Sequence, residues 1–253
     1  MMNPLAMKLE QFTKLDNEDR ARLDGWAGHR QKTWAARTDI ISEGDHVDHI
    51  HLVLSGLAAR YKLLPNGERQ IMAFLVPGDL CDLEVFILDE MDHGICATSD
   101  VKCALIHKDK VEEMLTESSN LTKALWWSTM TDSAVLRERI VDHGRRDARE
   151  RLAHLLYEML IRYRIVGLTQ DDAFEFPVTQ EELADASGMT PVHVNRTLKQ
   201  LRDEGVVDFR GKIVKIIDPS RVRELAQFNA NYLHLQRSAG RVGEAAKRAE
   251  DLL

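Results

Sequence analysis

The first half of the chain alternates apolar and polar residues over short runs, and turn-forming residues separate these runs. A period of about two is typical of β-strands. The clearest runs cover residues 49–54, 57–64, 69–76 and 101–107. This spacing predicts a small antiparallel, jelly-roll-like β-roll. A helix is expected before it, over residues 9–26, with these inward-facing side chains: Phe12, Leu15 and Leu23.

A second pattern follows the roll, because residues 109–143 contain neither glycine nor proline before the break at Gly144. Residues 121–141 are compatible with a helix, and their apolar members surround most of its circumference. Such a helix must be covered on two sides. We expect the roll on one side and the same helix of a second subunit on the other, although burial in a larger monomeric core would give the same pattern. The residues expected in the dimer contact are Trp127, Met130, Ala134, Val135 and Val141.

A break in the helical pattern occurs at residues 143–146, and a new helix is predicted over 147–166. Glycine adopts backbone conformations that end helices. Gly144 is therefore the predicted hinge and domain boundary, and bending at Gly144 is the expected way to reposition the C-terminal part of the chain.

Residues 176–207 carry the most specific motif of the sequence. Thr179 followed by Glu182 predicts a capping box at the start of a short helix, and Gly188 predicts a turn. Thr190 then caps a second helix, in which Pro191 takes the first position. Two strands predicted around residues 210–212 add a wing. The predicted fold is α+β: an N-terminal antiparallel β-roll, a long dimerisation helix and a C-terminal winged helix-turn-helix domain.

The outward face of the second helix suits double-stranded DNA. Arg196 can form two hydrogen bonds to a guanine edge, while Asn195 or His193 can read a neighbouring base and Val192 can contact a thymine methyl. Lys199, Arg202 and Lys212 are expected to neutralise phosphates. The helix N-termini at Gln180 and Pro191 add backbone donors. The expected DNA contacts are Thr179, Gln180, Thr190, Pro191, Val192, His193, Asn195, Arg196, Lys199, Arg202 and Lys212.

Charge is distributed unevenly along the 253 residues, whose net charge is -7. The first 144 residues hold 16 Lys and Arg against 24 Asp and Glu, whereas residues 188–217 hold six bases against three acids. A local basic patch therefore coincides with the predicted helix-turn-helix. The 44% hydrophobic content supports folded cores, and the apolar runs are too short to cross a membrane. We expect a cytoplasmic protein without a membrane partner.

Enzymatic function is not expected, because no nucleophile with its base, no phosphate-binding glycine loop and no metal-ligand spacing occurs. The three cysteines, Cys81, Cys96 and Cys103, are expected to be small buried residues, with a redox thiol as the alternative. An alternative function is a nucleotide-sensing regulatory module that acts through protein–protein contacts. The basic second helix favours a DNA-binding regulator over this alternative.

These motifs resemble the CRP/FNR family of bacterial transcription regulators. The resemblance covers residues 9–217 and rests on the glycine turns of the roll and on residues 179–207. It implies a cyclic-nucleotide-binding-like sensor domain and contact with RNA polymerase. It also implies a homodimer that binds a two-fold-symmetric operator, with the two copies of helix 190–202 in successive major grooves. The domains expected are 1–118 for the sensor roll with its flanking helices, 119–144 for the dimerisation helix and hinge, 145–219 for the DNA-binding domain and 220–253 for a helical extension.

Departures from the family pattern limit what the resemblance implies about ligands. The family's cyclic AMP receptors hold the phosphate with an Arg-Ser pair, and this chain has Asp92-His93 at roughly that place, with Leu83 and Glu84 before them as further residues of the candidate effector pocket. An acid near a phosphate disfavours cyclic AMP. An iron–sulfur cluster is excluded because residues 1–40 contain no cysteine. No cofactor or metal is predicted, and an unknown small-molecule effector stays open.

Three further features remain open from the sequence alone. His46, His49 and His51 leave haem open, although solvent-facing imidazoles explain them more simply. In the second helix, only Arg196 matches the residues with which many family members read DNA. We therefore expect an operator that differs from that of the cyclic AMP receptors. Residues 221–235 have helical spacing, and the tail to Leu253 can fold back on the DNA domain, add to the dimer contact or stay partly disordered. Neither the genes controlled nor the direction of control follows from the sequence.

Overall fold

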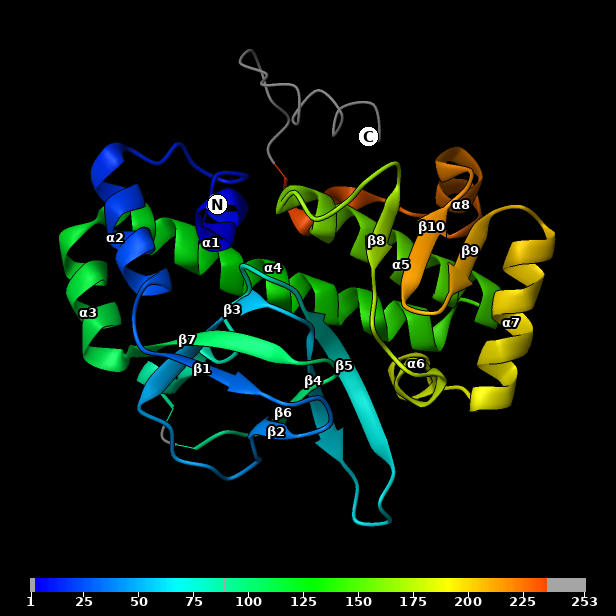
Figure 1. The fold of residues 1–253 in the computed structure, drawn as a ribbon, viewed down its shortest axis with the longest axis horizontal. Helices are drawn as coiled ribbons and strands as arrows, with labels where there is room; N and C mark the ends of the chain where they lie inside the picture. The colour runs from blue at the N-terminus through cyan, green and yellow to red at the C-terminus, as the bar shows by residue number, and fades with distance from the viewer. Residues whose placement is uncertain (1–2, 89, 236–253) are drawn as a thin grey trace.

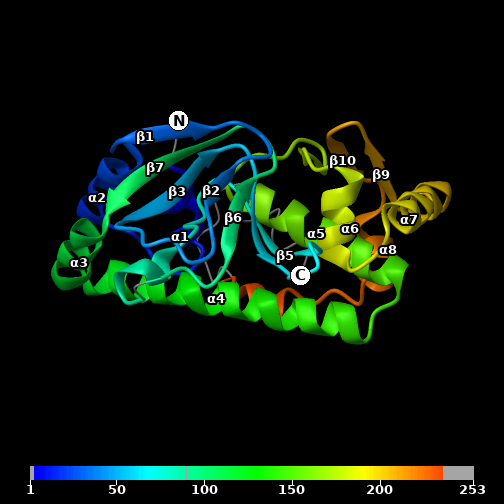
Figure 2. The same ribbon diagram turned by 90° about the horizontal axis from the view of Figure 1, so that it is seen from below.

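The computed structural model describes residues 3–88 and 90–235. A β-roll and a smaller α/β domain lie side by side, and one long helix runs along both of them (Figures 1 and 2). This arrangement confirms the predicted α+β fold with an N-terminal roll and a C-terminal helix-turn-helix.

The N-terminal segment forms two helices, so the prediction of one helix over residues 9–26 is wrong. Helix α1 covers Pro4–Leu9 and helix α2 covers Asn17–Ala27. The chain breaks between them because the Asp16 carboxylate accepts a hydrogen bond from the Asp19 N–H and so starts a new helix. The expected inward residues still face the core, with Leu15 and Leu23 buried and Phe12 half-buried.

The β-roll consists of two antiparallel sheets with the strand orders β1-β7-β3 and β2-β6-β4-β5. Its strands match the four predicted runs closely. Between β5 and β6 a 3₁₀ helix, η1, covers Leu83–Phe86. The strands are β1 (Gln31–Trp34), β2 (Asp39–Ile41), β3 (His49–Ser55), β4 (Ala58–Leu63), β5 (Arg69–Leu75), β6 (Gly94–Ala97) and β7 (Val101–His107).

The three cysteines and His51 all lie in the core of the roll. Cys81, Cys96 and Cys103 are free and buried, as expected. His51 is also buried, and its Nδ1 lies 2.6 Å from a carboxylate oxygen of buried Asp82. The expectation that His51 faces solvent is therefore wrong, because this buried acid gives the imidazole a partner inside the roll.

Helix α3 (Lys108–Glu117) leads from the roll into the long helix α4 (Ser119–Gly144). The Ser118 hydroxyl accepts a hydrogen bond from the Leu121 N–H and so caps α4. Figure 2 shows α4 passing beneath the roll and on beneath the C-terminal domain. Both domains therefore lie against one continuous helix.

The C-terminal domain begins with α5 (Ala148–Ile165), whose start is capped by Asp147. A three-stranded sheet of order β8-β10-β9 and two further helices pack around α5. The predicted wing is confirmed, since β9 and β10 pair antiparallel. The elements are β8 (Ala173–Glu175), α6 (Gln180–Ser187), α7 (Pro191–Asp203), β9 (Val207–Arg210) and β10 (Ile213–Ile216).

The extension after the wing contains α8 (Pro219–Leu225) and a 3₁₀ helix, η2 (Ala230–Leu233). It folds back over α5, where Phe228 packs edge-on against Tyr157 with ring centroids 4.9 Å apart. The Tyr232 hydroxyl donates to the Glu158 carboxylate at 2.8 Å. As far as Leu235 the extension therefore packs on α5, whereas a part in the dimer contact stays a prediction, and the remaining tail, 236–253, lies outside the described residues.

Candidate nucleic-acid interface

Helix α6 begins with the predicted capping box. The Thr179 hydroxyl accepts from the Glu182 N–H at 3.1 Å, and the Glu182 carboxylate accepts from the Thr179 N–H at 2.7 Å. Both side chains are therefore engaged within the protein. Gln180, the first residue of α6, is exposed.

The turn between α6 and α7 requires glycine. Gly188 has φ +61°, and a Cβ atom at this position would lie 3.0 Å from Nδ1 of His143 at the end of α4. Arg151 of α5 donates to the Ser187 carbonyl at 2.6 Å. The turn is thus fixed both by its own conformation and by contacts with α4 and α5.

Helix α7 has the buried and exposed faces that its spacing predicts. The Thr190 hydroxyl accepts from the His193 N–H at 3.2 Å, and Pro191 occupies the first turn. The side chains that fix the helix to the domain core are Val194, Leu198 and Leu201, all buried. This packing determines which residues face outward.

The outward face of α7 combines an apolar residue, an amide and two unpaired cations. Val192 is 81% exposed. Asn195 donates to the Gln180 side chain at 3.3 Å, which links the two helices at their N-terminal ends. Arg196 and Lys199 are exposed and form no hydrogen bond or ion pair with any described residue. Figure 1 shows α7 at the outer edge of the C-terminal domain, on the side away from most of the β-roll.

Arg202 has a different position from the one expected for a phosphate contact. Its Nε lies 2.9 Å from the Asp208 carboxylate, and its Nη2 donates to the Phe209 carbonyl at 3.2 Å. Arg202 therefore joins α7 to the first wing strand, because a neighbouring acid and a free carbonyl satisfy its donors. Lys212, at the wing turn, is exposed.

Thr190 and His193 line a cleft of about 1180 Å³ between the helix-turn-helix and the β4–β5 hairpin of the roll. At this cleft, Arg69 of β5 forms an ion pair with Asp185 of α6 at 2.8 Å. The side chain of Gln70 donates to the Asp185 carbonyl at 2.7 Å. The sequence did not indicate these contacts, because no local pattern links residues so far apart.

The exposed face of α4 differs from the predicted dimer contact. Trp127, Ala134 and Val135 are buried within the chain, whereas Met130 and Val141 are exposed. The first three pack against this chain's own domains, so they are not part of an outward face. Two residues that the prediction missed are strongly exposed: Trp126 at 66% and Ile140 at 72%.

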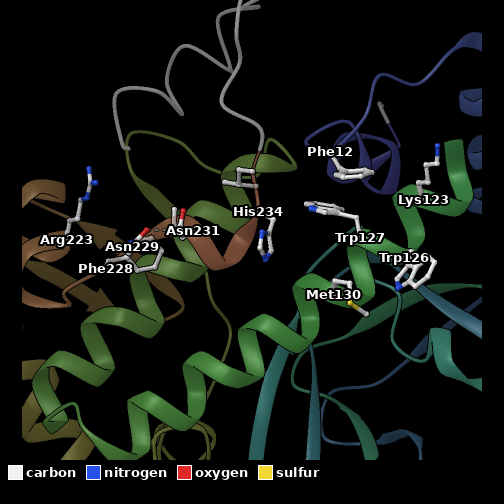
Figure 3. Close-up of a pocket in the computed structure, with 12 residues that line it drawn as sticks. Phe12, Lys123, Trp126, Trp127, Met130, Arg223, Phe228, Asn229, Asn231 and His234 are labelled. Carbon is white, nitrogen blue, oxygen red and sulfur yellow. Dashed lines mark hydrogen bonds between the residues drawn. The ribbon is translucent and has the colours of Figure 1, made fainter.

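The exposed residues of α4 form one outward stripe. Trp126, Met130, Arg137 and Ile140 recur at intervals that place them on one helical face. The stripe borders a groove of about 1120 Å³ between α4 and the extension, lined by aromatic side chains from both (Figure 3). Within the groove, Phe12 stacks on Trp127 with ring centroids 5.3 Å apart.

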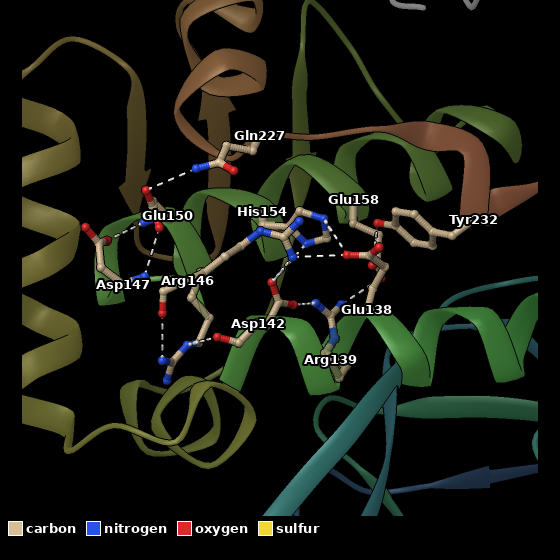
Figure 4. Close-up of polar contacts among 11 residues, drawn as sticks. Glu138, Arg139, Asp142, Arg146, Asp147, Glu150, His154, Glu158, Gln227 and Tyr232 are labelled. Atoms are coloured by element: carbon tan, nitrogen blue, oxygen red, sulfur yellow. Dashed lines mark hydrogen bonds and ion pairs between the residues drawn. The ribbon is translucent and has the colours of Figure 1, made fainter. Parts of the chain in front are cut away.

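A buried ionic network joins α4 to α5 near Gly144 (Figure 4). Arg139 pairs with Asp142 and with Glu158, each at 2.7 Å. Burial alone would raise the pKa of Asp142, but neighbouring His154 and Arg139 lower it to about 2. Gly144 itself is exposed, and a Cβ atom there would meet nothing within 4 Å. Its role as a hinge stays a prediction.

Two family models match the chain. Residues 31–118 match the cyclic nucleotide-binding domain, and residues 150–225 match the Crp-like helix-turn-helix domain. The chain belongs to the CRP/FNR family.

Similar CRP/FNR proteins are bacterial regulators. The transcriptional activator protein FnrL of Cereibacter sphaeroides is 28% identical over 217 residues, which cover 84% of this chain and 86% of FnrL. The nitrogen fixation regulation protein FixK of Bradyrhizobium diazoefficiens is 27% identical and covers 78% of this chain and 82% of its own length. The structure of FixK2 from Bradyrhizobium japonicum matches with a TM-score of 0.71 and 26% identity, covering 79% of this chain and 98% of FixK2.

The candidate effector residues of this CRP/FNR protein gather around a buried imidazole. His93 Nδ1 lies 2.5 Å from the Asp92 carboxylate, and its Nε2 lies 3.7 Å from the Glu84 carboxylate. Leu83 is half-buried against the roll core. The hydrogen bond from His93 lowers the pKa of Asp92. A cyclic phosphate at this place would meet two carboxylates, which does not suit an anion.

The described residues form neither a metal-binding cluster nor a membrane-spanning helix. Within 3–88 and 90–235, no group of three or more His, Cys, Asp and Glu side chains is arranged to hold a metal ion. No helix in the described part of this CRP/FNR chain is long and apolar enough to cross a membrane.

Proposed function

We propose that this protein is a sequence-specific transcription regulator that binds double-stranded DNA as a homodimer on a palindromic operator. One observation carries the proposal: Arg196 and Lys199 project from a firmly packed helix, exposed and without a partner among the described residues. Unpaired cations on a helix of this type suit the phosphates and base edges of a major groove.

The side chains of α7 divide into two roles. Arg196 reads a guanine through two hydrogen bonds, and Val192 contacts a thymine methyl beside it. Lys199 and, at the wing, Lys212 neutralise phosphates. The N-terminus of α7 adds backbone donors for a further phosphate.

The outward stripe of α4 is the dimer contact in this proposal. Exposed Trp126, Met130 and Ile140 form an apolar face that a second α4 would cover. A two-fold axis along α4 would present two α7 helices, an arrangement that suits a palindromic operator. Contact with RNA polymerase is part of the proposal, and the activator names of FnrL and other relatives support it.

The test is binding of the purified full chain to duplex DNA from a site selection, at several salt concentrations. Affinity should fall steeply as salt rises, because bound phosphates release counterions. Arg196→Ala with Lys199→Ala should weaken binding at least tenfold. Lys102→Ala, which removes an exposed lysine on the roll, is the matched control. Salt-independent binding, or full affinity in the double variant, would contradict the proposal.

The roll is proposed to respond to something other than cyclic AMP. The carboxylates of Glu84 and Asp92 beside His93 support this, since they repel a phosphate. Calorimetric titration of the full chain with cyclic AMP should give no heat of binding, and micromolar binding would overturn this part of the proposal.

A further inference from the structure

A cavity of about 50 Å³ lies where the roll, α4, α5 and the extension meet. Its walls include Arg60 of β4, Trp127 and Thr131 of α4, Val166 after α5 and Leu233 of η2. It is distinct from the cluster around His93, none of whose residues line it. A water molecule needs about 10–15 Å³ of such space, so the cavity has room for roughly four non-hydrogen atoms.

Three buried polar atoms of this cavity lining have no hydrogen-bond partner among the described residues. They are Arg60 Nε, Trp127 Nε1 and Thr131 Oγ1. The three side chains are only 7%, 9% and 7% exposed, respectively. Buried polar groups are nearly always satisfied, and leaving one without a partner costs about 1–3 kcal/mol. Three such atoms around one cavity favour a polar occupant that accepts hydrogen bonds from them.

The chemistry of these atoms defines the ligand. An arginine Nε–H and an indole N–H can only donate hydrogen bonds, and a threonine hydroxyl can donate as well. A complementary ligand therefore consists mainly of acceptors. Trigonal anions of this size carry two or three acceptor oxygens, which match these donors.

The charge of Arg60 points the same way. Its Nη2 donates to the Cys81 carbonyl at 2.8 Å, but no described carboxylate forms an ion pair with this buried guanidinium. Arg60 shares the inward face of β4 with Ala58 and is only 7% exposed, so water screens its charge little. A buried charge without a counter-charge is costly, and an anion in the cavity would remove that cost.

The other charged groups at the cavity nearly balance one another. Burial would raise the pKa of Asp79, but Lys8 and Arg162 lower it, and they lie 2.8 Å and 2.6 Å from its carboxylate. Asp132 lies on α4 near Arg162. Arg162 also lies 3.5 Å from buried Glu158, an acid that it shares with Arg139. Among the described cations that line the cavity, Arg60 is therefore the one without a carboxylate partner, and a monovalent anion would supply its counter-charge.

We propose that this cavity binds a small monovalent trigonal anion, a carboxylate or an inorganic oxyanion, through Arg60, Trp127 and Thr131. The ligand would touch both domains and α4, because the walls come from all of them. A role as a signal that changes DNA affinity rests on the proposed function, whereas the binding itself does not.

The test measures thermal unfolding of the full chain with sodium nitrate, formate or acetate, at constant ionic strength held by the sodium salt of MES, whose anion is too large for the cavity. At least one of the three anions should give a saturable rise in Tm. Two variants, Thr131→Val, which keeps the side-chain shape, and Trp127→Phe, should each weaken binding of that anion about tenfold. This is the effect expected from loss of one hydrogen bond to a charged ligand. Thr129→Val, on the exposed side of α4, is the control and should bind like the parent.

Three results would overturn the site: no saturable rise in Tm with any of the anions, an equal rise with all salts, or parent affinity in both Thr131→Val and Trp127→Phe. Arg60→Gln should abolish binding, and the two α4 variants keep the test decisive if Arg60→Gln does not fold. Operator affinity is measured separately with and without saturating anion. Unchanged affinity would overturn the signalling role alone, and absence of all DNA binding would overturn the proposed function while the anion site stands.

Discussion

Arg69 of the roll and Asp185 of the first helix of the helix-turn-helix form an ion pair, with 2.8 Å between Nε and the carboxylate. Burial alone would lower the pKa of Arg69, but the hydrogen bond with Asp185 raises it overall. Gln70 adds a hydrogen bond to the Asp185 carbonyl. The DNA-binding domain is thus attached to the roll by side chains as well as by α4.

Removal of this ion pair should loosen the contact between the domains. In a double-mutant cycle with Arg69→Ala and Asp185→Ala, the coupling free energy should be roughly 1 kcal/mol, because both side chains are mostly buried and the pair is well aligned. Urea unfolding of the parent, the two single variants and the double variant measures this coupling free energy. Arg69→Ala with Asp203→Ala, which do not contact each other, should be additive, and a coupling of zero for the ion pair would refute the prediction.

Arg202 and Arg196 should behave differently although both are basic residues of α7. Arg202→Ala should lower the free energy of unfolding by about 1 kcal/mol, because it removes the contacts to Asp208 and the Phe209 carbonyl. Arg196→Ala should change stability by less than about 0.5 kcal/mol, since Arg196 has no partner among the described residues. Chemical denaturation of both variants checks this, and equal stabilities would show that Arg202 does not hold the wing.

Sequence patterns predicted the fold because its elements depend on local chemistry. The strand periodicity of the roll, the capping box at Thr179 and the turn at Gly188 all follow from neighbouring residues. The prediction of one helix over residues 9–26 failed for a local reason as well: Asp16 caps a new helix, and this cap outweighs the apolar spacing.

Long-range contacts set what the sequence could not predict. Trp127 and Ala134 have apolar side chains like those of Trp126 and Ile140, and only the placement of the two domains decides which of them are covered. Arg202 resembles a phosphate contact until Asp208 is placed beside it. The partners of such residues come from separate elements, so the residue type alone does not reveal their role.

Substitution on the outward stripe of α4 should prevent dimerisation. Ile140→Glu places a charge on a face that is apolar and 72% exposed in the single chain, so it should shift the molecule to monomers at micromolar concentration. Ile87→Glu is the matched control, because Ile87 is an equally exposed isoleucine on the roll at 73%. Light scattering after size exclusion gives the mass, and a dimer that survives Ile140→Glu would contradict this interface.

The ionic network near the end of α4 should make stability depend on acid pH through Asp142. Its carboxylate pairs with Arg139 and Arg146, each at 2.7 Å, and its pKa is about 2 in the folded chain against 3.8 as the ordinary value. Because the folded pKa is depressed, the stabilisation is complete above about pH 4 and is lost as the pH falls toward 2. A shift of this size corresponds to about 2 kcal/mol.

Asp142→Asn should therefore be less stable than the parent by about 2–4 kcal/mol at pH 7, since it also leaves buried Arg139 without one of its acids. The difference between the two proteins should narrow between about pH 4 and pH 2. Urea unfolding at pH 7, 4 and 3 measures it. Glu113→Gln, which removes an exposed carboxylate paired with Lys110, should change stability little at any of these pH values. A difference between parent and Asp142→Asn that stays constant from pH 4 to pH 3 would show that the ionised Asp142 carboxylate does not hold α4 and α5 together.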